Sequence, residues 1–137
     1  MALVDTNVIL DDLLDRAPFA ETSHKILELA AEKKITAYIA WHSIPAIFYI
    51  LRKNFSAAER KNILLDLCGV VDIAVLGKSE IIDTFKDTNF DDLEDCLQEK
   101  CACSINADYI ITRNIEDFAS AKIPAILPVD FLKIVFP

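Results

Sequence analysis

Acidic side chains stand at three points of the chain where a site could form, just after two apolar runs and at the start of a helical segment. Asp5 directly follows a short apolar run, and Asp117 comes shortly after a second one at residues 109–112. The third group opens a helical segment and consists of Asp91, Asp92, Glu94 and Asp95. Carboxylates that converge repel one another unless a cation lies between them, and oxygen ligands without His or Cys select Mg²⁺ or Mn²⁺. If folding brings these points together, the chemistry would be metal-assisted attack of water on a phosphodiester.

Each acid also has a purely structural interpretation, and the residues alone leave both open. Asp5 could cap the helix that follows it, as Asp often does. Acids in the first turn of a helix are stabilised by the helix dipole, which would explain the group at 91–95. Asp92, Asp95 and Glu99 share a helical spacing that would also suit a solvated face. Asp117 could be a local cap.

The elements that position these acids alternate regularly along the chain. Strand-length apolar runs are found at 2–4, 37–41, 70–76, 109–112 and 123–129. Amphipathic or apolar helical patterns are found at 8–14, 21–33, 44–53, 57–68, 78–86, 91–106 and 130–135, with Ser43 and Ser56 as expected N-caps. The alternation predicts an α/β fold, a three-layer α/β/α sandwich with a central parallel sheet of about five strands. Ligands bind at the carboxyl edge of such sheets, where Asp5 and Thr112 would lie.

Length and composition narrow the class of protein. The 137 residues suit one domain, 1–137, and 53% apolar residues are enough for a full core. Two glycines exclude a Gly-rich phosphate loop. No apolar run approaches the roughly 20 residues that span a bilayer, so no membrane partner is expected. The acid at position 5 interrupts any signal peptide, which predicts a cytoplasmic location.

Cysteine spacing and net charge add two further limits. The four cysteines form no CxxC pair, which favours reduced, mostly buried thiols over a zinc site or a redox pair. The net charge of −8 disfavours broad electrostatic binding to nucleic acid. Clustered carboxylates that hold divalent cations reduce this objection, because their charge is neutralised in the working site.

Three motifs, in this order and spacing, resemble the PIN domain family over the whole chain. They are Val4-Asp5-Thr6-Asn7-Val8, Asp92-Leu93-Glu94-Asp95-Cys96-Leu97-Gln98, and the segment from Tyr109 to Phe118. The closest likeness is to bacterial single-domain members similar to the VapC-type toxins of toxin–antitoxin pairs. The resemblance implies a parallel α/β/α sandwich with an acidic cluster that binds Mg²⁺ or Mn²⁺ and cleaves single-stranded RNA.

Residue roles follow from the resemblance by position. Asp5 matches the first metal-binding acid of the family, and Asp95 matches the acid on the late helix. Asn114 and Asp117 match the pair after the fourth strand. The resemblance therefore implies a metal site made of Asp5, Asp95 and Asp117.

The remaining positions include one departure from the family pattern. Asn7 and Thr112 resemble the polar residues that orient the acidic cluster. Ala46 stands where family members usually carry an acid in the helix after the second strand, and Asp92 is the candidate substitute for it. Arg113 is expected to approach the RNA backbone.

Three functions remain open at this point. The first is a metal-dependent ribonuclease, the toxin of a toxin–antitoxin pair. The second is a PIN fold that no longer cuts and serves as an RNA-binding or protein-interaction module, which Ala46 and the acidic charge favour. The third, phosphotransfer of the haloacid dehalogenase type, fits worse because Asn7 stands where that pattern has a second acid. The expected partners are RNA, an antitoxin protein and, through the apolar helix at 44–51, a second copy of the chain.

Overall fold

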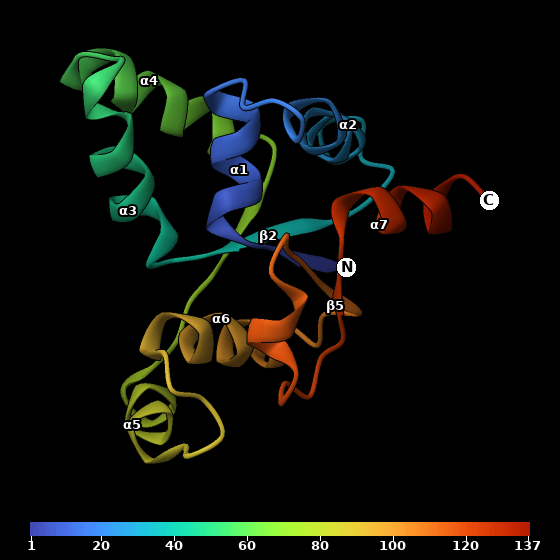
Figure 1. Cartoon of the computed structure of the whole chain (residues 1–137). Coiled ribbons are helices and arrows are strands. Elements are labelled where there is room, and N and C mark those ends of the chain that lie inside the picture. The colour runs from blue at the N-terminus through green and yellow to red at the C-terminus, as the bar shows by residue number, and fades with distance from the viewer.

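The apolar runs form a parallel sheet whose central strand is the one that ends at Asp5. The computed structural model describes all 137 residues (Figure 1). The strands are β1 (Ala2–Val4), β2 (Ala37–Ala40), β3 (Asp72–Ala74), β4 (Tyr109–Ile111) and β5 (Ala125–Ile126). They pair in parallel in the order β3-β2-β1-β4-β5. Asp5 therefore leaves the middle of the sheet, and the predicted five-stranded parallel α/β fold is confirmed.

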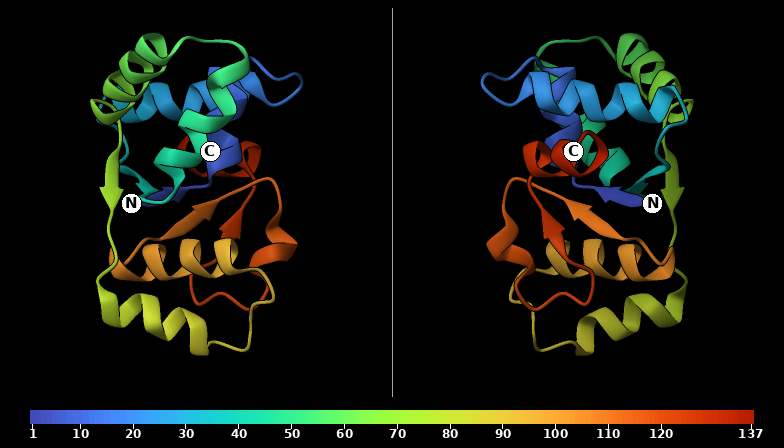
Figure 2. Two further views of the ribbon diagram at one scale, coloured as in Figure 1. Left: turned by 90° about the vertical axis from the view of Figure 1, so that its left-hand side faces the viewer. Right: turned by 90° about the vertical axis from the view of Figure 1, so that its right-hand side faces the viewer.

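Helices cover both faces of the sheet, which makes the three layers visible in Figure 2. One face carries α1 (Thr6–Leu13), α2 (Ala20–Ala31), α3 (Ser43–Ile50), α4 (Ala57–Cys68) and α7 (Pro128–Val135). The other face carries α5 (Lys78–Lys86) and α6 (Leu93–Ser104). Two short 3-10 helices follow α3 and β4, at Leu51–Lys53 and Ile115–Phe118. None of the helices has both the length and the apolar character needed to cross a membrane.

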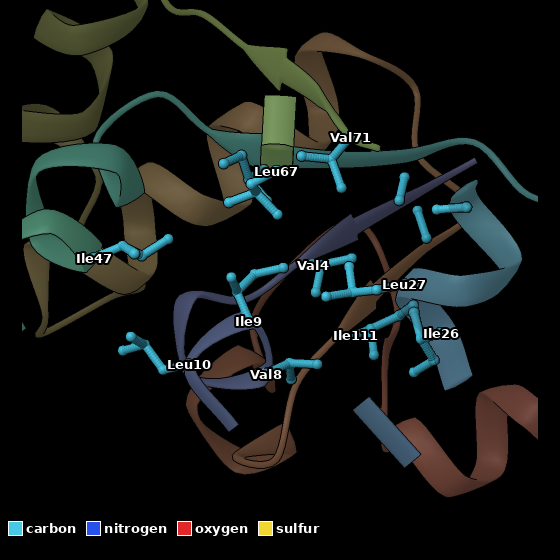
Figure 3. Close-up of a cluster of buried hydrophobic side chains, with 14 of the residues drawn as sticks. Val4, Val8, Ile9, Leu10, Ile26, Leu27, Ile47, Leu67, Val71 and Ile111 are labelled. Carbon is cyan, nitrogen blue, oxygen red and sulfur yellow. The ribbon is translucent and has the colours of Figure 1, made fainter. Parts of the chain in front are cut away.

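Alternation along the strands divides the core in two. Val4 and Ile111 point to the layer of α1 and α2, whereas Leu3 and Ile110 point to the layer of α6, as the two-residue period of a strand requires. Figure 3 shows the larger of the two clusters. Its labelled side chains are Val4, Val8, Ile9, Leu10, Ile26, Leu27, Ile47, Leu67, Val71 and Ile111. Strand β1 is thus held from both sides, which fixes the position of the residue that follows it.

Several predicted elements are shorter than the apolar runs that predicted them. The run at 70–76 contributes only β3, and the run at 123–129 contributes only β5. Both are edge strands and have a pairing partner on one side only. The end of the 44–53 helix is a 3-10 turn. One of the two predicted N-caps is confirmed, because Ser56 caps α4 in a full capping box. The other is wrong, because His42 and not Ser43 occupies the cap position of α3.

Helix α3 is less buried than its almost continuous apolar sequence predicted. Within it, only Ser43 and Ile47 are fully buried, and Tyr49 is 61% exposed. The helix packs against α1, α4 and β2, so one side stays open to solvent. Burial of this open side by a second copy of the chain stays a prediction.

The four cysteines are all unpaired, as expected. Cys96 and Cys101 are buried, Cys103 is partly buried and Cys68 is exposed. Burial raises the pKa of the Cys101 thiol to about 12, and burial together with a hydrogen bond to Glu99 raises the pKa of Cys103 to about 11. These two side chains are therefore neutral packing groups at physiological pH.

Candidate metal centre

Asp5 is built into the sheet edge and does not act as a helix cap. It stands at the N-cap position of α1, yet its side chain makes no capping hydrogen bond. Instead its Oδ2 accepts a hydrogen bond of 2.9 Å from Thr112 Oγ1 at the end of the neighbouring β4. The same Thr112 Oγ1 accepts from the backbone N–H of Asn114 at 3.1 Å. The capping interpretation of Asp5 is therefore wrong, and Thr112 holds its carboxylate in place.

Asp5 differs from the other buried acids in having no basic partner. Three carboxylates are at least nine-tenths buried, those of Asp5, Asp11 and Glu99. Asp11 pairs with Arg113 at 2.7 Å between Oδ2 and Nε, and Glu99 pairs with Lys100 at 3.3 Å. Around Asp5, which is 7% exposed, the charged groups that act on it are other acids. A buried carboxylate without a counter-charge is costly, so this is the position in the fold that a cation would stabilise.

The charges at this edge come from three separate parts of the chain. The pKa of Asp5 is raised to about 6, mainly by burial and in smaller part by the negative charges of Glu94 and Asp117, while the hydrogen bond from Thr112 acts to lower it. The pKa of Asp95 is raised to about 7, first by burial and then by its acidic neighbours, which include Asp92, Asp117, Glu94 and Asp5. Acids from β1, from α6 and from the segment after β4 thus lie within electrostatic reach of one another. That Asp5, Asp95 and Asp117 share one ion stays a prediction.

A pocket of about 250 Å³ is lined by residues from the start of α6 and from the segment after β4, and neither Asp5 nor Glu94 is among its lining residues. Asp92, Asp95 and Asp117 are among its lining residues, and the 3-10 helix at 115–118 lies against α6 (Figure 1). Carboxylate oxygens of Asp92, Glu94 and Asp95 all lie within 4.8 Å of one another. These donors are all oxygen atoms, the set that Mg²⁺ and Mn²⁺ prefer, and the uncompensated Asp5 supplies the buried charge. The residues present fit a hard divalent cation.

Asp92 and Glu99 show that the structural interpretations were partly correct. Asp92 caps α6, because its Oδ1 accepts from the backbone N–H of Asp95 at 3.0 Å. Glu99 does not belong to a solvated face, since it is buried and accepts a hydrogen bond from Cys103 Sγ at 2.9 Å. Helical spacing alone could not separate these two acids, because one lies at the exposed start of α6 and the other in its buried middle.

Arg113 has a structural task in this fold. Its guanidinium contacts Asp11 through Nε at 2.7 Å and through Nη2 at 3.2 Å. It also lies over the ring of Phe19, 4.1 Å from the ring centroid. Contact with RNA stays a prediction for Arg113, whose side chain already has these partners. Asn7 lies in the first turn of α1 and is half-buried; its orienting role also stays a prediction.

A polar network beside the acids was missed by the sequence reasoning. Ser43, expected to cap α3, is fully buried and shares a hydrogen bond of 2.7 Å with Thr6 Oγ1. Gln98 of α6 is also fully buried, and its Nε2 donates to Glu94 Oε1 at 2.9 Å and to Ser43 Oγ at 3.2 Å. The one available signal was the spacing of Glu94 and Gln98, which places them on the same side of a helix. Ala46, one turn beyond Ser43, brings no carboxylate to this network.

Comparison with known proteins gives the family. A family model described as the PIN domain matches residues 1–116. The chain belongs to the PIN domain family. No protein of curated function matches the PIN domain chain in sequence.

Solved structures agree with the fold of this PIN domain. VapBC2 from Rickettsia felis, bound to a promoter DNA fragment, has a TM-score of 0.66 and 17% identity over 92% of this chain and 97% of its own. FitAcB from Neisseria gonorrhoeae has a TM-score of 0.62 and 20% identity over 94% and 99%. FitAB bound to an IR36 DNA fragment has a TM-score of 0.67 and 17% identity over 93% and 95%. These similarities extend over nearly the whole of each chain.

Proposed function

We propose that this PIN domain is a Mg²⁺- or Mn²⁺-dependent ribonuclease that hydrolyses phosphodiester bonds in single-stranded RNA. The observation that carries the proposal is the buried Asp5, which forms no ion pair and feels the negative charges of Glu94 and Asp117 from two other parts of the chain. Membership of the PIN family supports the same class of chemistry.

The residues divide the work by position. Asp5 and Asp95 hold the ion, and Asp117 and Asp92 complete its shell or orient the attacking water. When bound, the ion lowers the pKa of that water and neutralises charge that builds up on the phosphate. Thr112 keeps the Asp5 carboxylate in place through its 2.9 Å hydrogen bond.

Two amides support this arrangement. Asn114 follows Thr112 and is tied to it through its backbone N–H. Asn7 follows Asp5 on the first turn of α1. We assign both amide side chains to orientation of the acids or of the water, because neither carries a charge for the ion.

Cleavage of RNA tests the proposal directly. Wild-type protein and Asp5→Asn are incubated with single-stranded RNA and Mn²⁺, with Asp91→Asn as a matched control at an exposed acid of the same edge. We expect Asp5→Asn to lower the cleavage rate by about 100-fold or more, the scale seen when a group that stabilises transition-state charge is removed. Equal RNA loss with all three proteins would rule out the mechanism.

A second candidate is a PIN fold that binds RNA or protein without cutting. The absence of an acid at Ala46 and the net charge of −8 favour it. Calorimetric titration with Mn²⁺ separates the two candidates. A binding signal that disappears in Asp5→Asn supports the enzyme, whereas no signal from the wild type supports the non-cutting module.

The similarity to VapBC2 and to FitAB also supports an antitoxin partner for this chain. If the chain is a toxin, its induced expression should arrest growth of a bacterial host, and Asp5→Asn should not. Co-expression of the reading frame next to its gene should then restore growth. Growth that continues under wild-type expression, with the protein present and active on RNA, would contradict the toxin role.

We further propose a homodimer that covers the open side of α3. Tyr49 projects from this helix with 61% of its surface exposed, and its ring stacks with Arg52 at 3.7 Å. Sedimentation analysis should show twice the mass of the 15.3 kDa chain, and Tyr49→Arg should reduce it to one chain. A monomeric wild type would contradict the dimer.

A further inference from the structure

The geometry points to Glu94 as a further metal ligand, with Gln98 and His42 as the residues that position it. This inference rests on the proposed function, because it assigns residues to the same ion. Glu94 would supply the carboxylate that Ala46 lacks, from α6 instead of α3. Neither the PIN resemblance nor the comparison with known proteins assigns Glu94, Gln98 or His42 to the site.

Glu94 is held far more firmly than an ordinary surface acid. Its side chain is 47% exposed, yet Oε1 accepts from Gln98 Nε2 at 2.9 Å and pairs with His42 Nε2 at 3.3 Å. Both donors come from buried or nearly buried side chains. Both of these contacts are made to Oε1, and neither uses Oε2. A carboxylate fixed on one oxygen by two donors is preorganised for a ligand on the other.

The donors of Glu94 join three elements beneath the acids. Gln98 Nε2 lies 3.2 Å from Ser43 Oγ on α3 and 3.3 Å from Thr6 Oγ1 on α1, next to Asp5. His42 occupies the cap position of α3. The start of α3 therefore contributes no acid to this site. It contributes His42, which forms a hydrogen bond with Glu94 of α6.

The orientation of the Gln98 amide is what a positioning role requires. Its Oε1 is buried and has no hydrogen-bond partner, which is costly inside a protein. A flipped amide would place this oxygen against the Glu94 carboxylate and remove the donor. The fold thus leaves one amide oxygen unsatisfied while the N–H group faces Glu94.

Glu94 also lies among the proposed ligands. Its carboxylate oxygen is within 4.8 Å of those of Asp92 and Asp95, and its charge acts on the buried Asp5. The competing interpretation is a helix-stabilising pair, since Glu94 and Gln98 are one turn apart in α6. The two interpretations differ in what they predict for metal binding.

The test is Mn²⁺ affinity measured by calorimetry at pH 8 on folded, full-length variants. Glu94→Gln removes the proposed ligand, and Gln98→Leu removes its positioning donor. His42→Phe removes the second donor and keeps the edge-to-face contact with Trp41, whose ring centroid is 5.5 Å away. Glu116→Gln is the matched control, because it removes one charge from an exposed acid that lines a pocket together with Asp95 and Asp117.

We expect Glu94→Gln to weaken Mn²⁺ binding by about 10- to 100-fold, and Gln98→Leu and His42→Phe by about 3- to 10-fold, the lower part of the range known for groups that orient metal ligands. Glu116→Gln should change the affinity by less than about 2-fold, as expected for an exposed charge in water. The double variant Glu94→Gln with Gln98→Leu should bind no more weakly than Glu94→Gln alone, because Gln98 acts through Glu94. If Glu94 and Gln98 formed only a helix-stabilising pair, the substitutions would lower the melting temperature and leave the Mn²⁺ affinity unchanged.

Each result decides the matter. An affinity of Glu94→Gln equal to that of Glu116→Gln overturns the inference while the proposed function stands, provided that Asp5→Asn abolishes binding. Additive losses in the double variant overturn the positioning role of Gln98. If Gln98→Leu does not fold, His42→Phe carries the test of positioning. Absence of Mn²⁺ binding by the wild type overturns both this inference and the proposed function.

Discussion

Replacing Asp5 by Asn should make the metal-free protein more stable at alkaline pH. Burial raises the pKa of Asp5 from 3.8 to about 6 in the folded state. The folded protein therefore holds this proton more tightly than the unfolded chain, so the free energy of unfolding falls as the pH rises from about 4 to above 6. Asn is neutral and has nearly the same shape, so Asp5→Asn removes this loss of stability.

The magnitude follows from the size of the shift. A shift of about two pKa units, at about 1.4 kcal/mol per unit, corresponds to about 3 kcal/mol at pH 8. The side chain is almost fully buried, so solvent screening does not reduce this figure much. At pH 4, where the folded wild type is already protonated, most of the difference disappears. Relative to the wild type, the free energy of unfolding of Asp5→Asn should thus rise by about 2 to 3 kcal/mol as the pH is raised from 4 to 8.

Urea unfolding in the presence of EDTA measures this gain, with the fluorescence of Trp41 as the probe. The exposed Asp91→Asn serves as the control and should change by less than about 0.5 kcal/mol at either pH. Addition of Mn²⁺ at pH 8 should stabilise the wild type and leave Asp5→Asn unchanged. A difference between Asp5→Asn and the wild type that is the same at both pH values would refute the reasoning, because it would show that Asp5 is not destabilised by its charge.

Three further results are expected. The pKa values of Asp5 and Asp95 are raised to about 6 and about 7, so protons should compete with the ion. The Mn²⁺ affinity measured by calorimetry should therefore fall by at least about 10-fold from pH 8 to pH 5.5. An affinity that does not change with pH would contradict this. Arg113→Ala should lower the free energy of unfolding by about 3 kcal/mol, since it leaves the buried carboxylate of Asp11 without its main partner. If Arg113 served only to bind RNA, the substitution would leave the stability unchanged. Leu10→Ala should cost about 3 kcal/mol in urea unfolding and the exposed Leu65→Ala close to zero; equal costs would contradict the assigned core.

Local patterns were enough to predict the elements that carry the acids. An apolar run that ends on Asp5 predicts a buried strand with a candidate site residue at its end. The interior of such a strand does not accommodate a charge, so the acid stands where the strand stops. Thr112 could be placed beside it for the same reason, as parallel strands end at one edge. The electrostatic effect of Asp117 on Asp5 is in keeping with the position of Asp117 just after that strand.

Contacts between distant side chains could not be predicted in the same way. Arg113 finds its partner Asp11 far away in the sequence and on another element, and nothing in the local pattern of either residue marks the pair. Ser43 is a residue type that often caps helices, but its hydroxyl forms hydrogen bonds with Thr6 and Gln98 where α1, α3 and α6 pack together. Such pairings are decided by tertiary packing, which overrides local preference.

The ends of the outer strands were also beyond local reasoning. An apolar run at the edge of a sheet pairs on one side only, so fewer of its residues form a regular strand. This explains why β3 and β5 are shorter than the runs that contain them. The exposure of Tyr49 on α3 has a similar cause, because the number of neighbours of a helix is a property of the whole fold.

The central claim is that carboxylates from both ends of the chain share one cation. The most direct measurement is anomalous scattering from crystals of the wild-type protein soaked with Mn²⁺ at pH 8. We expect one strong peak at the carboxyl edge of the sheet, in contact with oxygens of Asp5 and Asp95 and within reach of Asp117. Crystals that bind Mn²⁺ only elsewhere, with no peak beside Asp5, would contradict it.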